Sequence, residues 1–424
     1  MTENRTTRVS GPRRGLSLLA GNLVLAGAAV LASLSVCELL LRLLGVGYPV
    51  VVWTDPVRGV AHIPGASWGV LQPDGQRWIE INSDGLRGPE VVLAHPAGTF
   101  RIALLGDSFI EAFEVPFSKT VGEVLEHRLS ALRGTPVEVL NFGMGGYGTA
   151  QELLTLQHEV WKYSPDLVLL AVTTGNDISD NYRSLNRGDY RPYYVFRGAD
   201  LVLDTSFLQS RGYRSRAVWT RRLLGVVQQS RLVQLANRVR HLRRKGERQL
   251  VNRVRHAERK SERQGENAGG APGEEVGLRD EVQLPPTTPD WQAAWSVTEG
   301  LLRLMRDECR SQHTPFAVVT LTRGIQVTPV REQKERFLRR LGATDLYYPE
   351  RRLEEFGKRE GIPTFNLAPA MAVQAEERHA YFHAFHDSLG IGHWNEAGHR
   401  AAGELIASWL ARELAGDSTR ASQP

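Results

Sequence analysis

The sequence has few cysteines and few lysines for a chain of 424 residues. Its two cysteines, Cys37 and Cys309, exclude a fold held together by several disulfides and a zinc site with four cysteine ligands. Six of the 52 basic residues are lysines, and this bias extends along the whole chain, so richness in arginine does not by itself indicate a nucleic-acid partner. Hydrophobic residues make up 42% of the sequence and charged residues 23%, which excludes wholesale disorder and supplies a sizeable core.

The formal net charge of +5 comes from one segment of the chain. Residues 211–265 hold 17 basic and 3 acidic side chains, so the rest of the chain has a net charge of −9. A basic surface is therefore expected on that segment alone. The length of the chain allows two or three domains of about 150 residues each.

The amino-terminal region carries the pattern of a membrane anchor. Leu16–Cys37 is a run of 22 residues without a charged side chain, and a helix of that length spans about 33 Å, enough for a bilayer core of about 30 Å. Four arginines and one acid precede the run, which predicts that residues 1–15 are a cytoplasmic tail. A cleaved signal peptide would have a shorter apolar region, of about 7–15 residues. We therefore expect a retained signal anchor over residues 16–44, with the rest of the chain outside the cytoplasm.

The remaining chain divides by composition. Residues 45–98 are rich in Gly, Pro and Trp and predict a collar of loops and hairpins. Residues 99–416 alternate short apolar runs with helical segments, which predicts a parallel sheet covered on both faces, and a tail follows at 417–424. The expected strands are 102–105, 137–141, 167–172, 316–321 and 362–367. The expected helices are 121–132, 151–163, 291–310 (with Asp290 as its N-cap), 351–359 and 397–414.

An insertion of about a hundred residues, about 182–290, interrupts this alternation. Within it, residues 228–260 combine apolar residues at helical spacing with many arginines, which is typical of a basic amphipathic helix. Such a helix can lie on an anionic membrane surface or bind an acidic polymer, or it can simply be a solvated helix packed on the domain. The predicted location outside the cytoplasm argues against nucleic acid as a partner. Residues 265–289 are rich in Gly, Pro and Glu and predict a flexible linker.

Two segments that could carry chemistry follow the first two expected strands. Gly106-Asp107-Ser108 places a serine at a strand terminus among backbone N–H groups, although this tripeptide also occurs in ordinary turns. Four glycines within residues 143–148 let the backbone approach a ligand closely. A dinucleotide loop is set aside, because it would follow the first strand of the unit rather than the second.

Two further segments follow the third strand and precede the last helix. The amide of Asn176 can donate to developing negative charge, or it can form an Asx turn that caps a helix. His393, expected in a loop before the last helix, can serve as a general base. His399 lies six residues further on, but no carboxylate stands at ligand spacing, so a metal site is not expected.

Together, Ser108, Gly146, Asn176 and His393 occur in the order and context in which the sequence resembles the SGNH (GDSL-type) hydrolase superfamily. The resemblance covers about residues 99–414 without the insertion, and residues 81–88 resemble the lead-in of membrane-anchored bacterial members. It implies a flavodoxin-like three-layer α/β/α domain with a mostly parallel five-stranded sheet. It also implies that Ser108 is the nucleophile and His393 the base, and that Ser108 N–H, Gly146 N–H and the Asn176 amide form the oxyanion hole.

The sequence departs from the family pattern at two positions. The family's D-x-x-H motif would place an aspartate at position 390, which is glycine. Asp387 is the nearest acid on that segment and is the candidate to orient the histidine; otherwise the site is a Ser–His dyad. The family's G-x-N-D motif is altered as well, because Thr174 stands where glycine is expected.

These observations predict a cell-membrane protein with one membrane-spanning helix, residues 16–37, and an extracytoplasmic serine esterase domain. Its expected substrate is an acylated carbohydrate or lipid of the cell envelope, with acetyl as one candidate acyl group. Two alternatives remain open: an O-acyltransferase of a surface polysaccharide, and a non-catalytic, anchored polysaccharide-binding protein. No phosphate-binding loop or metal motif is present in the sequence, so we expect neither cofactor nor metal.

Overall fold

The computed structural model describes residues 13–44, 47, 50–72, 75–186, 188, 190–218, 229–236, 239, 278–385 and 388–420. Contacts within the chain divide it into two compact units. The first comprises Met1–Val50 and Leu223–Gln264, and the second comprises Val51–Arg222 and Gly265–Pro424. The second unit contains the sheet and the candidate site, and residues 51–98 of the expected collar belong to it.

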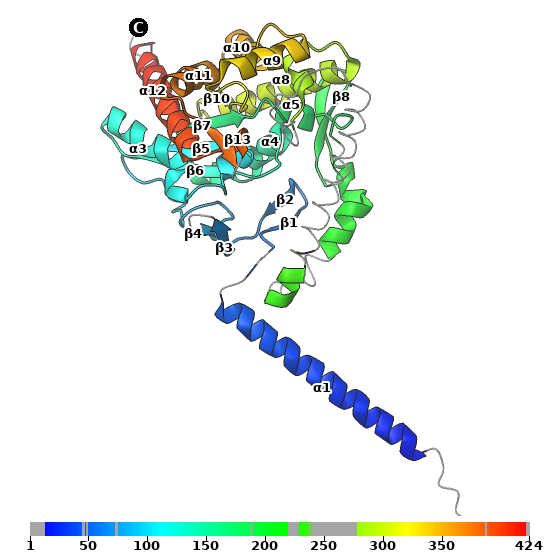
Figure 1. The fold of residues 1–424 in the computed structure, drawn as a ribbon. Helices are drawn as coiled ribbons and strands as arrows, with labels where there is room; N and C mark the ends of the chain where they lie inside the picture. Colours follow the sequence, from blue (N-terminus) through cyan, green and yellow to red (C-terminus); the bar gives the residue numbers. More distant parts are fainter. Residues whose placement is uncertain are drawn as a thin grey trace, which may run out of the picture. The chain divides into compact units, whose positions relative to one another are not determined.

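Five parallel strands form the central sheet of the second unit (Figure 1). In spatial order they are β11 (Thr364–Asn366), β10 (Phe316–Thr320), β7 (Leu167–Val172), β5 (Phe100–Gly106) and β6 (Val137–Gly143). Every neighbouring pair is parallel. Counted along the chain, the order is 2-1-3-4-5, as in flavodoxin-like sheets, and the connections change direction between β5 and β7. Ligands of such sheets bind beyond the carboxyl ends of the strands near that point.

Helices cover both faces of the sheet, because successive strand side chains point in opposite directions. Alternate residues of β5, such as Ile102 and Leu104, pack with α3 (Val121–Arg133), α11 (Leu367–Arg378) and α12 (Glu396–Arg420). The intervening residues pack with the helices of the other face, which are α4 (Thr149–His158), α8 (Pro289–Ser311) and α10 (Tyr348–Glu360). Figure 1 shows α3 and α12 on one side of the sheet and α8 on the other. The predicted three-layer α/β/α fold is therefore confirmed.

The start of α8 differs from the expected one. Asp290 is not the N-cap, because Thr288 takes that position and its side chain accepts a hydrogen bond from the Trp291 N–H. Pro289 occupies the first helical position, where its fixed φ suits the helix and its missing N–H costs nothing. Cys309, near the other end, is fully buried, and burial raises the pKa of its thiol to about 12.

The collar consists of two antiparallel hairpins. Strands β1 (Val52–Asp55) and β2 (Gly59–His62) form the first, and β3 (Ser67–Gln72) and β4 (Gly75–Glu80) form the second. The remaining described elements are α2 (Ser108–Glu111), η1 (Phe117–Lys119), η2 (Val160–Tyr163), α5 (Asp177–Asp180), β8 (Tyr193–Arg197), β9 (Asp200–Asp204), η3 (Ser206–Gln209), η4 (Asp280–Gln283), α9 (Arg331–Leu341), β12 (His383–Phe385) and β13 (Ser388–Trp394).

The insertion begins as an ordered part of the second unit. Strands β8 and β9 pair antiparallel and contact α8. The second half of the expected flexible linker, residues 278–289, is packed rather than loose. Asp280 forms ion pairs with Arg323 at 2.8 Å and Arg340 at 2.7 Å, and Val282 is buried in the core. Residues 265–277 lie outside the described residues.

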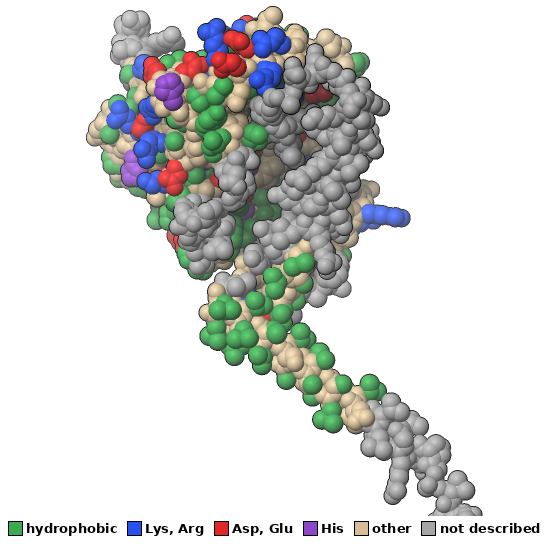
Figure 2. Space-filling view, viewed as in Figure 1, with side chains coloured by type: hydrophobic (Ala, Val, Ile, Leu, Met, Phe, Trp, Pro, Cys, Tyr) green, Lys and Arg blue, Asp and Glu red, His purple; other side chains and the backbone are tan. Residues whose placement is uncertain are grey.

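Helix α1 (Arg13–Leu43) contains the predicted anchor. Its segment Gly21–Leu43 has a mean hydropathy of 2.2 and is long and apolar enough to cross a membrane. Hydrophobic side chains follow the described part of the helix, Gly21–Leu43 (Figure 2). A signal sequence meets the same criteria, so the helix supports an amino-terminal membrane anchor or signal sequence.

Within the first unit, the beginning of the basic segment contacts α1. The Glu38 carboxylate accepts hydrogen bonds from the N–H groups of Arg231 at 2.9 Å and Leu232 at 3.0 Å. Of the basic helix expected over 228–260, the structure describes residues 229–236 and 239, so most of that prediction lies outside the described residues.

Candidate active site

Ser108 lies where β5 ends and α2 begins. The carboxylate of Asp107 caps the helix by accepting a hydrogen bond from the Phe109 N–H at 2.9 Å. This cap bends the chain sharply out of the sheet, so that Ser108 stands at the carboxyl end of β5 and is only partly buried. The serine therefore occupies the edge of the sheet at which sites of this fold form.

His393 meets this serine directly. Its Nε2 atom lies 2.7 Å from the Ser108 Oγ. The expectation of a loop at this position was wrong, because His393 belongs to strand β13, which pairs antiparallel with β12. His393 itself stands at the irregularity in this pairing, between the paired residues Leu389 and Trp394. The structure thus brings together two residues that stand 285 positions apart in the chain.

Buried side chains behind the hairpin fix the histidine strand. His383 contacts the carbonyl of Gly392 through Nδ1 at 2.7 Å and the Thr322 hydroxyl through Nε2 at 2.8 Å. The indole N–H of Trp394 donates to the same hydroxyl at 2.8 Å. Burial lowers the pKa of His383 to about 4, so this ring stays neutral near pH 7. Residues on both sides of His393 are therefore anchored.

Glu114 is the acid that contacts the histidine, and no sequence pattern marks it. Its Oε1 lies 3.0 Å from His393 Nδ1. Because an ionised carboxylate only accepts hydrogen bonds, Nδ1 carries the proton and Nε2 is left to accept one from Ser108. Ala112, in the left-handed conformation (φ 54°), turns the chain back after α2 and brings Glu114 toward the histidine. Asp387, the expected acid, lies outside the described residues.

The collar holds the segment that carries Glu114. The Arg87 guanidinium, 3% exposed, donates to the carbonyls of Glu111 at 2.5 Å, Ala112, and Val115 at 2.6 Å. The Glu111 carboxylate also contacts His62 Nε2 at 2.7 Å. Arg87 lies shortly after strand β4 of the collar. The collar thus contacts the backbone on both sides of Glu114.

Gly146 lies in a tight turn after β6. The Tyr147 N–H donates to the Met144 carbonyl at 3.1 Å, and Gly146 has the φ of +79° that a type II turn requires at its third position. Residues 143–148 have the spacing G-x-G-x-x-G, but they follow the edge strand β6 rather than β5, so the turn does not form a dinucleotide loop. At Gly143, a Cβ would lie 2.3 Å from the Glu111 N, so only glycine lets this segment pass beside α2.

Asn176 lies after β7 and is linked to the serine turn. Its Nδ2 donates to Asp107 Oδ2 at 3.2 Å. The amide carries two N–H donors, so a second hydrogen is available beside the one bound to Asp107. The Met144 N–H donates to the Gly106 carbonyl at 3.1 Å, which attaches the glycine turn to the same place. All four sequence-predicted segments therefore meet at the carboxyl edge of the sheet. Among the described residues, no group of three His, Cys, Asp or Glu side chains is placed to hold a metal ion.

The departure at Thr174 is matched by a buried acid on α10. The Thr174 hydroxyl donates to Glu350 Oε1, and both side chains are fully buried. Burial raises the pKa of Glu350 to about 7. A glycine at position 174 could not make this hydrogen bond, so the threonine has a structural partner that explains its presence.

The raised pKa of Glu350 predicts a pH-dependent contribution to stability. Between about pH 4.5 and 7 the folded protein holds a proton that the unfolded chain has lost, so this stabilising contribution decreases as the pH rises through that window. Glu350→Gln cannot titrate. Its free energy of unfolding, relative to the wild type, should therefore rise by up to about 1.4 kcal/mol per pH unit there. Denaturant titrations across the window test this, with Glu355→Gln, an exposed position on α10, as the control. A difference independent of pH would contradict the prediction.

Comparisons with known proteins add little beyond this geometry. No protein-family model and no curated protein matches the sequence. Among solved structures, the chain is similar to a lipolytic protein of the G-D-S-L family from Desulfitobacterium hafniense, with 10% identity, coverage of 73% of this chain and 98% of that one, and a TM-score of 0.33. A lipase/acylhydrolase from Enterococcus faecalis is 15% identical, with 75% of this chain and 96% of that one covered and a TM-score of 0.33. A catalytic mutant of an acetylxylan esterase from Geobacillus stearothermophilus is 10% identical, with 76% of this chain and 96% of that one covered and a TM-score of 0.35. At these TM-scores, the case for this chain depends on its own topology and site.

Proposed function

We propose that the protein is a serine esterase that hydrolyses acyl esters of a cell-envelope carbohydrate or lipid outside the cytoplasm. The observation that carries this proposal is the continuous series of contacts from Ser108 Oγ to His393 Nε2, and from His393 Nδ1 to Glu114 Oε1. A nucleophile, a base and a group that orients the base, each within hydrogen-bond reach of the next, are the arrangement that activates a serine hydroxyl.

In the first half of the proposed reaction, Ser108 Oγ attacks the ester carbonyl carbon as its proton passes to His393 Nε2. The Glu114 carboxylate stabilises the imidazolium that forms. The N–H groups of Ser108 and Gly146 and the second amide hydrogen of Asn176 donate to the oxyanion. Removing one such donor typically costs about 3–4 kcal/mol of transition-state stabilisation. The intermediate collapses, and the alcohol leaves with the proton from His393, so that Ser108 carries the acyl group.

In the second half, water gives a proton to His393 Nε2 as its oxygen attacks the acyl carbon. The same donors bind the second oxyanion. Collapse breaks the bond to Ser108 Oγ, which takes the proton back from His393, and the carboxylic acid leaves. Every proton therefore returns to its starting atom, and the reaction consumes only ester and water.

The proposed location follows from the amino-terminal region. Helix α1 is long and apolar enough to cross a membrane. Arg5, Arg8, Arg13 and Arg14, with one acid, precede the apolar run, and positive charge favours the cytoplasmic side. These charges support a cytoplasmic amino terminus and a catalytic domain outside, where envelope carbohydrates and lipids supply the esters.

Hydrolysis of p-nitrophenyl acetate and labelling by a fluorophosphonate test the activity, using the full chain in detergent. We expect turnover and a single label on the peptide that contains Ser108. Labelling without turnover would replace the esterase with an acyltransferase that lacks its acceptor. If the protein neither hydrolyses the ester nor takes the label, the enzymatic proposal is overturned and the anchored binding protein is favoured.

A further inference from the structure

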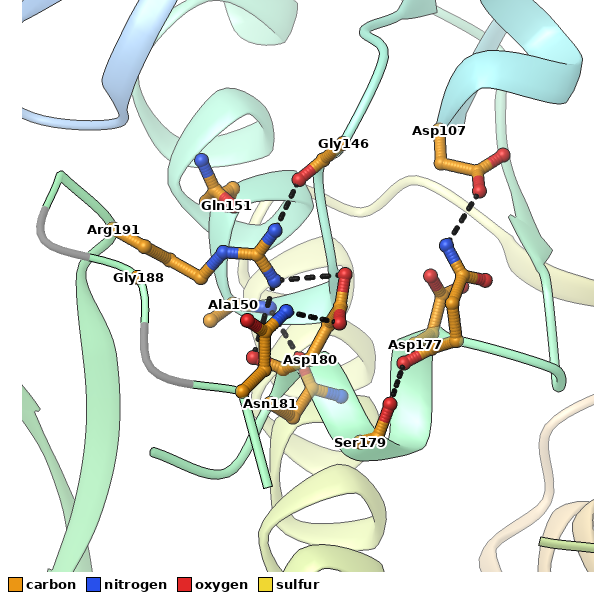
Figure 3. A network of polar contacts seen from close by, with 12 residues as sticks. Asp107, Gly146, Ala150, Gln151, Asp177, Ser179, Asp180, Asn181, Gly188 and Arg191 are labelled. Carbon is orange, nitrogen blue, oxygen red and sulfur yellow. Dashed lines mark hydrogen bonds and ion pairs between the residues drawn. The ribbon is translucent and has the colours of Figure 1, made fainter. Parts of the chain in front are cut away.

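Arg191 connects the two segments that carry the proposed oxyanion donors (Figure 3). It lies at the beginning of the insertion, between α5 and β8, and its side chain is 14% exposed. Its Nη1 lies 2.9 Å from Asp180 Oδ2 and donates to the Asp180 carbonyl at 3.2 Å. Its Nη2 donates to the carbonyl of Gly146. One guanidinium thus reaches both segments at once.

Each of these contacts holds a segment that carries one of the proposed oxyanion donors. Gly146 itself belongs to the turn after β6, and Asp180 ends α5, the short helix whose N-cap is Asn176. The two segments also meet at Asn181, which accepts a hydrogen bond from the Ala150 N–H at 3.2 Å and donates to the Thr298 hydroxyl at 3.0 Å. Displacing either segment would move a donor away from the oxyanion.

The surroundings of Arg191 give its charge a second effect. Asp107, Glu152 and Asp177 are buried and close enough to interact electrostatically with one another and with Asp180. Burial raises the pKa of Glu152 and Asp177 well above the usual range, so they favour the neutral form. Asp180, by contrast, is paired with Arg191. The pairing offsets negative charge that would otherwise oppose an oxyanion nearby.

We propose that Arg191 is a positioning residue of the oxyanion hole, which holds the Gly146 turn and the Asn176 helix in register through the two arms of its guanidinium. The inference rests on the proposed esterase function. It also assigns a role to the insertion (about residues 182–290), because Arg191 belongs to it. Lysine cannot replace arginine here, since a single ammonium lacks the planar fork that bonds two carbonyl groups and a carboxylate together.

The test compares Arg191→Met, Arg191→Lys and Arg191→Ala with the wild type in p-nitrophenyl acetate hydrolysis. A displacement of donors by about 1 Å costs about 100-fold in rate, so we expect kcat to fall by about 10- to 100-fold in Arg191→Met with little change in KM. Arg191→Lys should recover most of the thermal stability but little of kcat. Added guanidinium should restore part of kcat in Arg191→Ala.

The matched control is Arg352→Met, which removes an ion pair of the same length, 2.9 Å to Glu299, on helix α10. It should lower stability without changing kcat. If Ser108-dependent hydrolysis is present and kcat of the Arg191 variants follows their stability alone, the positioning role is overturned while the esterase stands. If the wild type neither hydrolyses the ester nor takes the label, the esterase proposal fails, and the positioning role fails with it.

Discussion

Replacing Ser108 with alanine is expected to lower kcat for ester hydrolysis by about 10⁵- to 10⁶-fold. The variant lacks the oxygen that forms the acyl-enzyme, so only the slow attack of water in the oxyanion hole remains. His393→Ala should cause a loss of similar size, since the serine hydroxyl then has no base at 2.7 Å to accept its proton. The double variant should be hardly worse than either single one, because the two residues act as a unit.

The measurement is steady-state hydrolysis together with fluorophosphonate labelling. Ser130→Ala is the control, because the Ser130 hydroxyl accepts a hydrogen bond from the Val137 N–H at 2.9 Å, beside the amino end of β6 and away from the site. It should keep its activity. Turnover that survives in Ser108→Ala would show that another group is the nucleophile.

Much of the fold could be predicted from the sequence because its signals are local. The fully apolar run of β7, for example, is buried along its whole length, as expected of a strand covered on both faces. The hairpin of β12 and β13 carries no such signal, since its strands are short and include Gly390 and Gly392, which both have positive φ. The N-cap of α8 was misplaced because Asp290 and Thr288 are both good capping residues, and Pro289 between them decides in favour of threonine.

The candidate site likewise contains residues whose convergence the sequence predicts and one residue, Glu114, that it does not. Ser108, Gly146 and Asn176 directly follow successive strands, and parallel strands place such positions at one edge. Their roles stay proposals, as does that of His393, but their convergence could be expected. Glu114 could not be found in this way. Its approach to His393 depends on the left-handed turn at Ala112 and on Arg87, and neither a short-range pattern nor a family motif marks such a contact.

Glu114→Gln is expected to lower kcat by about 10²- to 10⁴-fold while leaving KM nearly unchanged. The glutamine amide can present an N–H to His393 Nδ1, which favours the tautomer with the proton on Nε2. That tautomer cannot accept the proton of Ser108. The substitution also removes the negative charge that stabilises the imidazolium formed during attack. Because neither effect involves binding of the ester, the loss should appear in kcat.

Two further variants make this prediction decisive. Glu376→Gln, on helix α11, removes an acid that contacts Lys334 at 2.7 Å and should leave kcat unchanged. Asp387→Asn tests the rival acid indicated by the sequence. If Glu114 is the orienting group, the large loss belongs to Glu114→Gln, and Asp387→Asn stays within a few-fold of the wild type. A loss confined to Asp387→Asn would return that role to the segment before His393, whereas full activity in both variants would leave a Ser–His dyad. The contact at 3.0 Å between Glu114 and His393 favours the first outcome, because a carboxylate held there by the turn at Ala112 requires no rearrangement to orient the ring.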